Sequence, residues 1–351
     1  MLSSFTKRPA ECTIVVGMSG GVDSSVTAAL LQRSGFNVVG VTLQLSNSEK
    51  KVKSCCSDKD IQDAHDVAIH MGFPHYVLDY VDSFKAGVID NFVEEYAAGF
   101  TPSPCVRCNQ RIKFGDLLHF AKKVGADAVA TGHYAKHILC DNQIMLARPK
   151  DIAKDQTYFM AMVNRDVINM IRFPLGPYLK PEVRQIAADL GLAIANKGDS
   201  QDLCFIQNGS YRDILKEIGQ KAGRGIIVNS DDEVLGYHDG VHNYTVGQRK
   251  GIEISNGPWF VIKIIANENK VVVGRQSELL RDSFEVDQVN LMTDHMPDQV
   301  LVQVRARHKP VLGSLIGSTV HLHEPTTSIA PGQISAFYDG DTLLGGARIL
   351  R

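Results

Sequence analysis

A buried strand that runs into a glycine-rich loop and then a helix constrains this fold more than any other feature of the sequence. Residues 13–17 are apolar and β-branched, which is typical of a parallel strand buried on both faces. The loop at residues 17–25 follows, and apolar residues at helical spacing continue to Arg33. Adjacent glycines let the backbone approach an anion, and a helix N-terminus adds its positive dipole end. We therefore expect an α/β domain with a phosphate-binding loop.

Strands and helices alternate along the following hundred residues. We expect further strands at residues 38–45, 75–78 and 128–130, and helices at 58–71, 84–96 and 114–124. This alternation predicts βαβ units, a parallel sheet and helices on both of its faces. The ligand of such a sheet lies at the carboxyl ends of the strands.

After about residue 205 the sequence changes to short strand-like runs separated by turns. These runs lie at residues 226–228, 234–237, 259–265, 270–273, 300–304, 318–323, 333–338 and 342–350. Residues 267–269 and 338–340 are hairpin signals. We predict a catalytic ATP-binding domain at 1–207, a small linker domain at 208–281 and a C-terminal β-barrel at 282–351.

Composition and charge narrow the class of protein. Apolar residues make up 44% of the chain, but no apolar run reaches the roughly 20 residues of a membrane span. Residues 1–11 are polar, unlike a secretory signal. We expect a cytoplasmic protein with no membrane partner. The net charge of −2 excludes a globally basic nucleic-acid binder but leaves room for a local basic surface.

Seven cysteines are spread along the chain, which does not indicate an extracellular disulfide scaffold. Cys105 and Cys108 form a Cys-x-x-Cys pair in what we expect to be a proline-stiffened loop, and Cys204 is a second candidate site. Such a pair in a cytosolic chain indicates redox chemistry or metal binding. A zinc site needs four ligands, usually from two pairs, and only one pair is present.

The remaining cysteines have simpler interpretations. Adjacent cysteines rarely chelate one metal, so Cys55 and Cys56 are interpreted as solvent-facing loop thiols. Cys12 and Cys140 lie in strand-like runs, where we expect small core residues.

The glycine-rich loop belongs to neither of the two commonest nucleotide motifs. No Gly-Lys-Ser/Thr follows it, and its glycines are wrongly spaced for a dinucleotide fingerprint. The loop resembles the pyrophosphatase-type (PP-loop) ATP site of enzymes that cleave ATP to AMP and pyrophosphate. That resemblance implies an adenine-nucleotide alpha-hydrolase-like domain, with Asp23 helping to hold magnesium on the pyrophosphate.

Six motifs together resemble the tRNA-specific 2-thiouridylase family over nearly the whole chain. They are GMSGGVDSS at 17–25, PCVRCNQRIKF at 104–114, ATGHYA at 130–135, KDQTYF at 154–159, GDSQDLCFI at 198–206 and NYTVGQRKGI at 243–252. The resemblance implies a sulfurtransferase that thiolates C2 of the wobble uridine of tRNA after ATP has adenylated it. It also implies a sulfur-donor protein, either a cysteine desulfurase or a relay protein.

The resemblance implies the following site residues. Cys204 carries the incoming sulfur as a persulfide, and Cys108 is the nucleophile that ends in a disulfide with it. ATP contacts Gly17, Met18, Ser19, Gly20, Gly21, Val22, Asp23, Ser24, Leu43 and Gly132. The tRNA contacts Lys154, Asp155, Gln156, Arg305 and Ala306.

Two positions depart from the family pattern. Many members carry an aspartate, the proposed general acid/base, where this chain has Cys105, and a thiol does not simply replace that proton transfer. Cys105, Cys108 and Cys204 are also the ligand set for a [4Fe–4S] cluster with one open iron, which is the rival mechanism to the persulfide. Ala306 replaces an aromatic residue common after the arginine.

Two other functions fit part of the sequence. Another PP-loop enzyme, such as an amide-forming synthetase, would explain the loop but leave Cys108 and Cys204 without a role. A non-catalytic RNA-binding protein is disfavoured because residues 19–24 are intact. Basic residues also cluster around the motifs, which favours a substrate groove; they are Arg107, Arg111, Lys113, Arg249, Lys250, Arg305, Arg307 and Lys309.

Overall fold

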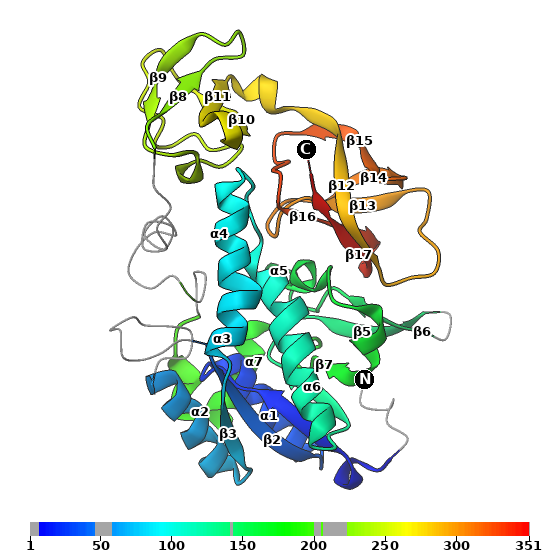
Figure 1. Ribbon diagram of the computed structural model, residues 1–351. Helices are drawn as coiled ribbons and strands as arrows, with labels where there is room; N and C mark the ends of the chain where they lie inside the picture. Colours follow the sequence, from blue (N-terminus) through cyan, green and yellow to red (C-terminus); the bar gives the residue numbers. More distant parts are fainter. Residues whose placement is uncertain (1–6, 46–57, 141–142, 200–204, 206–222, 351) are drawn as a thin grey trace. The chain divides into compact units, whose positions relative to one another are not determined.

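The computed structural model describes residues 7–45, 58–140, 143–199, 205 and 223–350, which form two compact units (Figure 1). Unit 1 draws on residues 1–88, 105–208 and 341–343, and unit 2 on 89–104, 209–340 and 344–351. Within the described ranges, no helix is both long enough and apolar enough to cross a membrane.

A parallel sheet forms the core of unit 1, as the alternation of elements predicts. Its described strands run in the order β3-β2-β1-β4-β7, and the adjacent pairs are all parallel. The strands are β1 (Thr13–Gly17), β2 (Asn37–Gln44), β3 (His75–Asp79), β4 (Ala128–Thr131) and β7 (Ile171–Arg172). The helices beside them are α1 (Val22–Arg33), α2 (Asp58–Met71), α3 (Val81–Phe84), α6 (Leu117–Lys123) and α7 (Lys180–Asp189).

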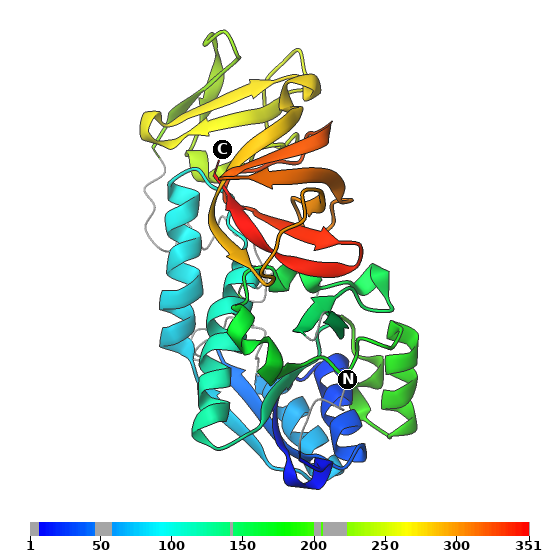
Figure 2. The ribbon, with the colours of Figure 1, turned by 90° about the vertical axis from the view of Figure 1, so that its right-hand side faces the viewer.

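The central strand is buried on both faces, which explains its continuous apolar sequence. Ile14 and Val16 pack in one cluster with Val26 of α1 and Val183 of α7. Val15 lies between them and points to the opposite face, where it is also fully buried. Helix α6 packs against β1 and β4, and Figure 2 shows helices along both faces of the sheet.

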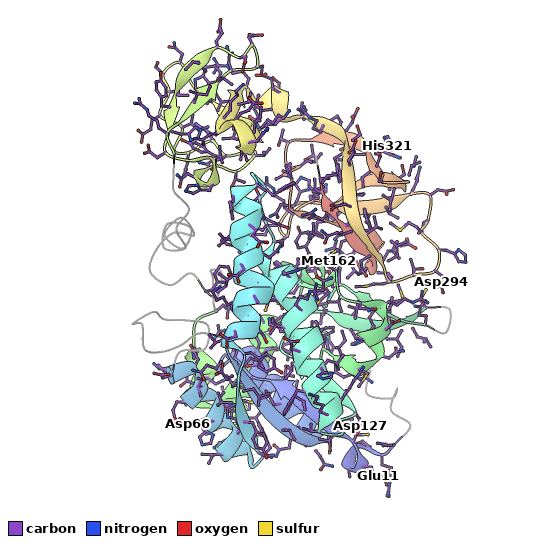
Figure 3. All side chains as sticks on the ribbon, viewed as in Figure 1. Glu11, Asp66, Asp127, Met162, Asp294 and His321 are labelled. Carbon is purple, nitrogen blue, oxygen red and sulfur yellow. The ribbon has the colours of Figure 1, made fainter. Side chains whose placement is uncertain are left out.

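Asp127 fixes the register between two central strands. Its carboxylate accepts from the backbone N–H of Thr13 at 2.9 Å, and its own N–H donates to the Thr13 carbonyl at 2.8 Å. Lys7 also donates to the Asp127 carboxylate. Figure 3 labels Asp127 at this edge of unit 1. The pairing sets β1 and β4 side by side, so that both strands end at the same edge.

Two helices in the described part of the chain contain π-helical segments. The predicted helix at 84–96 is α3, continued by a π-helical turn at Lys85–Ile89 and by α4 (Asp90–Ala97). The second helix begins as α5 (Pro104–Cys108), continues through a π-helical segment at Asn109–Asp116 and ends as α6. The prediction of a loop around the cysteine pair is therefore wrong. Pro104 occupies the first helical position, where its fixed φ fits and no N–H is required.

A β-hairpin and short 3₁₀ turns complete unit 1. The hairpin is β5 (Lys136–Cys140) and β6 (Gln143–Ala147). Cys140 ends β5 and is exposed, so the prediction that it is a core residue is wrong, whereas Cys12 is fully buried as expected. A strand-like sequence cannot show that its last residue lies at the open end of a hairpin. The 3₁₀ turns are Pro9–Glu11, Ile152–Lys154, Thr157–Met160, Arg165–Met170 and Ala193–Asn196.

Unit 2 contains a small sheet around a core of valine and isoleucine side chains. Its described strands lie in the order β10-β11-β8-β9 and are β8 (Gly225–Val228), β9 (Val234–His238), β10 (Phe260–Ile265) and β11 (Lys270–Gly274). The predicted turn at 267–269 joins β10 and β11, and Asn269 adopts the left-handed conformation that such turns require (φ 48°). The 3₁₀ turns of this unit are Val241–Asn243, Ala266–Glu268 and Gln276–Leu279.

The rest of unit 2 is the predicted antiparallel barrel. In the described residues, the order β12-β15-β14-β13-β16-β17 closes through pairing of β12 with β17. The strands are β12 (Arg281–Leu291), β13 (Val300–Gln303), β14 (Val311–Ile316), β15 (Thr319–Thr326), β16 (Ile334–Asp339) and β17 (Thr342–Ile349). The sequence analysis missed β12 and β14. In β12 only Phe284 and Val286 of the eleven residues are buried, so the alternation of apolar and polar residues is too short to be distinctive.

Arg348 joins three elements of unit 2. From β17 its guanidinium contacts the Asp287 carboxylate of β12 (Nε–Oδ1, 2.8 Å) and the Glu95 carboxylate of α4 (Nη1–Oε1, 3.1 Å). Hydrogen bonding to Asp287 raises the pKa of Arg348, although partial burial opposes the shift. The guanidinium also lies 5.5 Å from the centre of the Phe100 ring. This cluster holds α4 against the closing strands of the barrel.

We expect Arg348→Ala to lower the free energy of unfolding by roughly 1–3 kcal/mol, because two partly buried carboxylates lose their cation. Urea titration followed by the fluorescence of Trp259, the single tryptophan of the chain, measures the change within unit 2. Asp232→Asn is the control, since the Asp232 side chain is 72% exposed in its ion pair with Lys270. This substitution should change the free energy of unfolding by less than about 0.5 kcal/mol. Equal midpoints for the wild type and Arg348→Ala would contradict this assignment.

Candidate functional site

The loop between β1 and α1 is shaped by glycine at one critical position. Gly20 has φ +69°, and a Cβ there would lie 2.1 Å from the carbonyl oxygen of Asp60. Only glycine allows this approach of the loop to α2. Gly21 is extended (φ −94°, ψ 163°) and caps the N-terminus of α1. The first N–H groups of α1 therefore face the loop, as an anion site requires.

Three serines of the loop stabilise its own backbone. The hydroxyls of Ser24 and Ser25 donate to the Gly21 carbonyl at 3.1 and 3.0 Å. Ser24 Oγ also accepts from the Ser19 N–H at 3.1 Å. Ser24 and Ser25 are buried, whereas Ser19 is exposed. Ser19 Oγ lies 3.3 Å from Ser24 Oγ, but Ser19 is the exposed member of the three, so its hydroxyl is the one that an incoming anion can reach.

The predicted ATP-site residues lie at one edge of the sheet. Gly17, Leu43 and Gly132 lie at or just after the carboxyl ends of β1, β2 and β4, which are parallel neighbours. Met18 and Val22 belong to the hydrophobic core of unit 1, so their side chains are unavailable to a ligand. The Met18 N–H donates to the Val41 carbonyl at 2.8 Å, and the Met18 carbonyl accepts from Thr42 Oγ1 at 2.9 Å.

Gly132 allows β4 to approach the first turn of α1. A Cβ at this position would lie 2.7 Å from both the Asp23 carbonyl carbon and the Ser24 nitrogen. Real Cβ atoms essentially never come so close to backbone atoms. Glycine at 132 is therefore required for the end of β4 to meet the nucleotide loop.

Asp23 receives two donors that the sequence analysis did not identify. Lys180 Nζ lies 2.7 Å from both carboxylate oxygens, and the Tyr134 hydroxyl donates to Oδ1 at 3.0 Å. Lys180 is only 8% exposed. Burial and the neighbouring Asp23 carboxylate raise the pKa of Tyr134, so its hydroxyl stays protonated and donates. The Asp23 carboxylate is thereby held beside the loop.

Asp199 holds Lys180 from the other side. Its carboxylate contacts the amines of Lys180 and Lys154 at 2.9 and 2.8 Å and the guanidinium of Arg184 at 2.8 Å. Burial alone would raise the pKa of Asp199, but hydrogen bonds from Lys154 and Lys180 outweigh it and lower the pKa to about 2. Asp199 is therefore a carboxylate at any physiological pH.

Lys197 joins the loop to α2. Its amine donates to the Gly20 carbonyl at 2.9 Å, to Asp60 Oδ1 at 2.6 Å and to the Asp63 carboxylate. Burial lowers the pKa of Lys197, but the bonds to both aspartates outweigh it, and the net shift is upward. The amine thus fixes the same Gly20 segment that packs against Asp60.

A half-buried histidine, His133, follows Gly132. The two ring nitrogens of His133 contact Thr131 Oγ1 at 2.7 Å and Lys113 Nζ at 3.4 Å. Burial, followed by the Lys113 charge, lowers the pKa of His133, so the imidazole is neutral. Since the lysine amine can only donate, the nitrogen facing it accepts and the other donates to Thr131.

The predicted tRNA stretch, residues 154–156, is built into the same network. Asp155 forms a nearly buried ion pair with Arg148 and accepts from Thr157 N and Oγ1 at 2.9 and 2.7 Å. Gln156 Oε1 accepts from the Tyr134 N–H at 2.8 Å, and the Gln156 N–H donates to the Tyr134 carbonyl at 3.0 Å. Only Lys154 keeps a substantially exposed side chain (40%).

In unit 2, one of the predicted tRNA residues, Arg305, contacts the motif at 243–252. Arg305 Nη2 donates to the Val246 carbonyl at 3.0 Å. The carbonyls of Arg305 and Ala306 accept from Gln303 Nε2 at 3.1 and 3.0 Å. Arg305 is half-buried and orders this segment of unit 2.

The cysteine pair lies on one turn of helix α5. Cys108 is buried and Cys105 is half-buried. Neighbouring polar side chains fix this helix, since Arg107 Nε donates to the Gly87 carbonyl and Asn109 Nδ2 to the Phe159 carbonyl, both at 3.1 Å. Cys204 lies outside the described residues, as do Cys55 and Cys56. Among the described residues, no cluster of three or more potential His, Cys, Asp or Glu metal ligands occurs.

Sequence reasoning missed Lys180, Lys197, Tyr134 and Asp199 as site residues. Tyr134 and Asp199 lay inside motifs that were recognised without roles. Lys180 carried a local signal, because it is the first residue of α7, where a cation opposes the helix dipole. A nearby carboxylate would stabilise a lysine at such a position. The sequence could not show that Asp23, more than 150 residues earlier, supplies it.

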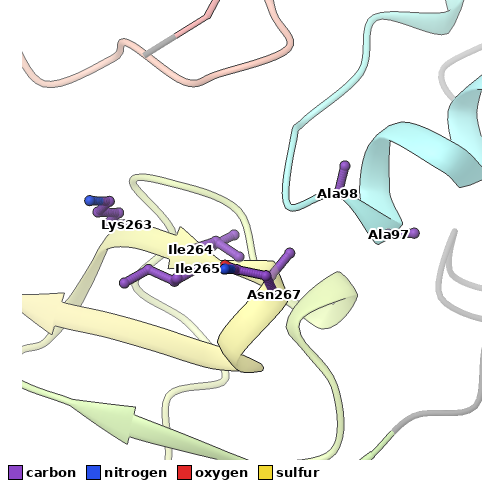
Figure 4. Close-up of a pocket in the computed structure, with 7 residues that line it drawn as sticks. Ala97, Ala98, Lys263, Ile264, Ile265 and Asn267 are labelled. Atoms are coloured by element: carbon purple, nitrogen blue, oxygen red, sulfur yellow. The ribbon is translucent and has the colours of Figure 1, made fainter.

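A pocket in unit 2 has no connection with the predicted site residues. Its volume is about 540 Å³, and its lining comes from the end of α4 and from the end of β10 with the turn after it (Figure 4). The lining residues are Ala97, Ala98, Lys263, Ile264, Ile265, Ala266 and Asn267. Its lining is mostly apolar, with Lys263 and Asn267 as the polar members and no carboxylate.

Comparison with known proteins yields matches along the whole chain. Family models described as tRNA methyl transferase HUP domain, tRNA methyl transferase PRC-barrel domain and aminomethyltransferase beta-barrel domain match residues 12–208, 212–275 and 281–349. The chain is similar to the tRNA-specific 2-thiouridylase MnmA of Zymomonas mobilis, with 44% identity over 96% of this chain and 92% of that protein. The same enzyme of Orientia tsutsugamushi is 44% identical, over 97% and 96%.

Solved structures resemble the chain more distantly. A 4-thiouridine synthetase in complex with RNA and ATP matches with a TM-score of 0.37 and 17% identity, over 60% of this chain and 50% of that one. The NMN synthetase of Francisella tularensis matches with a TM-score of 0.37 and 18% identity, over 62% and 81%.

We expect Gly132→Ala to weaken ATP binding roughly ten-fold or more, because the new methyl group displaces the first turn of α1. Equilibrium dialysis with labelled ATP measures this change. Gly236→Ala is the matched control, since its methyl group would meet Ile254 at an ordinary 3.5 Å, and it should bind ATP like the wild type. Unchanged ATP affinity in Gly132→Ala would show that β4 does not shape the nucleotide site.

Proposed function

The chain belongs to the tRNA-specific 2-thiouridylase family, and we propose that it thiolates C2 of the wobble uridine of tRNA in an ATP-dependent reaction. The observation that carries the proposal is the nucleotide loop, in which Gly20 and the start of α1 form an anion site beside a fixed carboxylate, Asp23. The name of the matching family models mentions methyl transfer. The full-length relatives are thiouridylases, and methylation would leave the cysteine motifs without a role.

ATP activates an oxygen that otherwise leaves poorly. The uridine O2 attacks the α-phosphorus of ATP, pyrophosphate departs, and the adenylated oxygen can then leave as AMP. Backbone N–H groups of residues 20–23 and the positive end of α1 stabilise the charge on the pyrophosphate. We assign Gly17, Leu43 and Gly132 to the adenosine side of this site, at the edge where β1, β2 and β4 end.

The residues present fit a magnesium ion on the nucleotide. Mg²⁺ is usually held by one or two carboxylates together with substrate phosphates, and Asp23 offers such a carboxylate on the first turn of α1. When bound, Mg²⁺ neutralises the charge of the leaving pyrophosphate. Asp23 would hold it, with the exposed hydroxyl of Ser19 close to the same phosphates.

Sulfur transfer is assigned to two cysteines. A sulfur-donor protein, which is a cysteine desulfurase or a relay protein, transfers a sulfane sulfur to Cys204. The terminal sulfur of the Cys204 persulfide attacks C2, and AMP leaves. The Cys108 thiolate then attacks Cys204 Sγ, the sulfur–sulfur bond to the base breaks, and a Cys108–Cys204 disulfide remains. Formation of this disulfide oxidises the two cysteines and provides the two electrons that reduce the sulfur left on C2 of the base. An external dithiol then reduces the disulfide and restores both thiols.

The iron–sulfur alternative rests on Cys105. Cys105 and Cys108 are one helical turn apart, a spacing that allows two ligands of a cluster. The third ligand would be Cys204, which lies outside the described residues. We favour the persulfide route, which needs only Cys108 and Cys204, and derive no step through a cluster.

Binding of tRNA is assigned to two segments. Lys154, Asp155 and Gln156 lie in unit 1, and Arg305 and Ala306 in unit 2. Lys154 is the member that can reach a phosphate, since Asp155 and Gln156 are engaged within the protein. Arg305 would act by ordering residues 246–247. We place the enzyme in the cytoplasm, with domains at 1–207, 208–281 and 282–351.

The proposal predicts that AMP and 2-thiouridine form only when ATP, magnesium, a sulfur donor and tRNA are all present. Asp23→Asn should lower the rate of AMP formation by roughly 100-fold or more, because the metal loses its charged ligand. Glu182→Gln is the matched control, since it removes one carboxylate charge from an exposed ion pair on α7. Nucleoside analysis measures 2-thiouridine, and AMP quantification measures the adenylation step in the wild type and in both variants. AMP formation at the wild-type rate in Asp23→Asn would refute the role of Asp23.

Serine variants separate the two sulfur routes. Cys108→Ser and Cys204→Ser should each abolish thiolation, because a hydroxyl neither carries a persulfide nor closes a disulfide. On the persulfide route, Cys105→Ser retains measurable activity in air, since Cys105 supplies no sulfur. On the cluster route it loses activity together with bound iron. Thiolation assays, combined with iron and acid-labile sulfide analysis after anaerobic purification, check these outcomes.

A further inference from the structure

One carboxylate, Asp199, binds cations from two separate segments of unit 1. Lys154 ends a 3₁₀ turn within the stretch assigned to tRNA, whereas Lys180 and Arg184 lie one turn apart on α7. All three cations lie 2.8–2.9 Å from Asp199 oxygens. A single carboxylate shared by three cations binds each of them less strongly than it would bind one. The strength of each contact therefore depends on the others.

Lys180 is in turn shared between two carboxylates. Its amine lies 2.7 Å from both oxygens of Asp23 and 2.9 Å from Asp199. With little solvent around it, the amine has few alternative partners. Its position between Asp23 and Asp199 is thus set by the relative pull of these two groups. Any change in the charge around Asp199 changes how firmly Lys180 is held on Asp23.

A second route connects the same two regions. Gln156, two residues after Lys154, exchanges two hydrogen bonds with the backbone of Tyr134. The hydroxyl of Tyr134 donates to Asp23 at 3.0 Å. The stretch 154–156 therefore reaches Asp23 both through charges and through a hydrogen-bonded chain. This chain keeps the Asp23 carboxylate in place when Lys180 shifts.

We propose that Asp199 is a positioning residue that couples tRNA binding at Lys154 to the Asp23 carboxylate of the nucleotide loop. This inference rests on the proposed function. An RNA phosphate that binds Lys154 draws it away from Asp199. Asp199 then holds Lys180 more strongly, Lys180 releases Asp23, and the freed carboxylate is available to the magnesium of Mg·ATP. By reciprocity, Mg·ATP strengthens tRNA binding to the same extent.

The test measures binding rather than turnover. The dissociation constant of a non-hydrolysable ATP analogue with Mg²⁺ is determined by calorimetry, with and without saturating tRNA transcript. In the wild type, tRNA should tighten analogue binding by at least about five-fold, the lower end of typical coupling between sites. The ratio of the dissociation constants without and with tRNA should fall to near one in Asp199→Asn and in Lys154→Ala. The double variant should show no further loss of this ratio.

Two further variants distinguish coupling from a merely structural role. Asp199→Glu keeps the charge and should restore most of the ratio, whereas Glu182→Gln on α7 should keep the wild-type ratio. An Asp199→Asn protein that weakens analogue binding equally with and without tRNA, so that the ratio is preserved, would overturn the proposal. A wild-type ratio of one would also overturn it, even if thiolation proceeds. Absence of tRNA-dependent AMP formation in the wild type would instead refute the proposed function itself.

Discussion

The ion pair between Lys180 and Asp23 is the contact on which the arrangement of the nucleotide site depends. It joins the first residue of α7 to the first turn of α1 across more than 150 residues of sequence. Both ends carry a second restraint, because Tyr134 donates to Asp23 and Asp199 binds Lys180. A largely buried lysine is stable as a cation only when carboxylates compensate its lost hydration. The contacts of the Lys180 amine therefore join Asp23 and Asp199, which are distant in sequence.

The loop itself owes its shape to close contacts rather than to flexibility. Gly20 is the residue that lets the loop touch the backbone of α2, and Lys197 bonds to both sides of that contact. Gly132 likewise lets the end of β4 approach the backbone of α1 closely. Serine hydroxyls bond to the Gly21 carbonyl within the loop. An anion site assembled in this way is already formed before a ligand binds, which lowers the reorganisation that binding requires.

Several motif residues also form bonds within the protein. Asp155 and Gln156, which the proposal assigns to RNA binding, have side chains that contact Arg148 and the backbone of Tyr134 within unit 1. Arg305 similarly supports the Val246 segment of unit 2. Such residues can act on a substrate by holding others in place. Cys105 and Cys108 were expected in a loop, but they lie on a helix, where one turn separates them on the same face.

The sequence by itself determined the parallel sheet, the barrel and the location of the nucleotide loop, because these depend on local periodicity, glycine spacing and turn chemistry. The buried run at 13–17 and the hairpin turns at 267–269 and 338–340 carry that information within a few residues. Only the tertiary structure decided the partners of Asp23, Gly20 and Lys154, and the exposure of Cys140. Pairings between charges more than 40 residues apart leave no periodic trace, since any lysine could meet any aspartate until the chain folds.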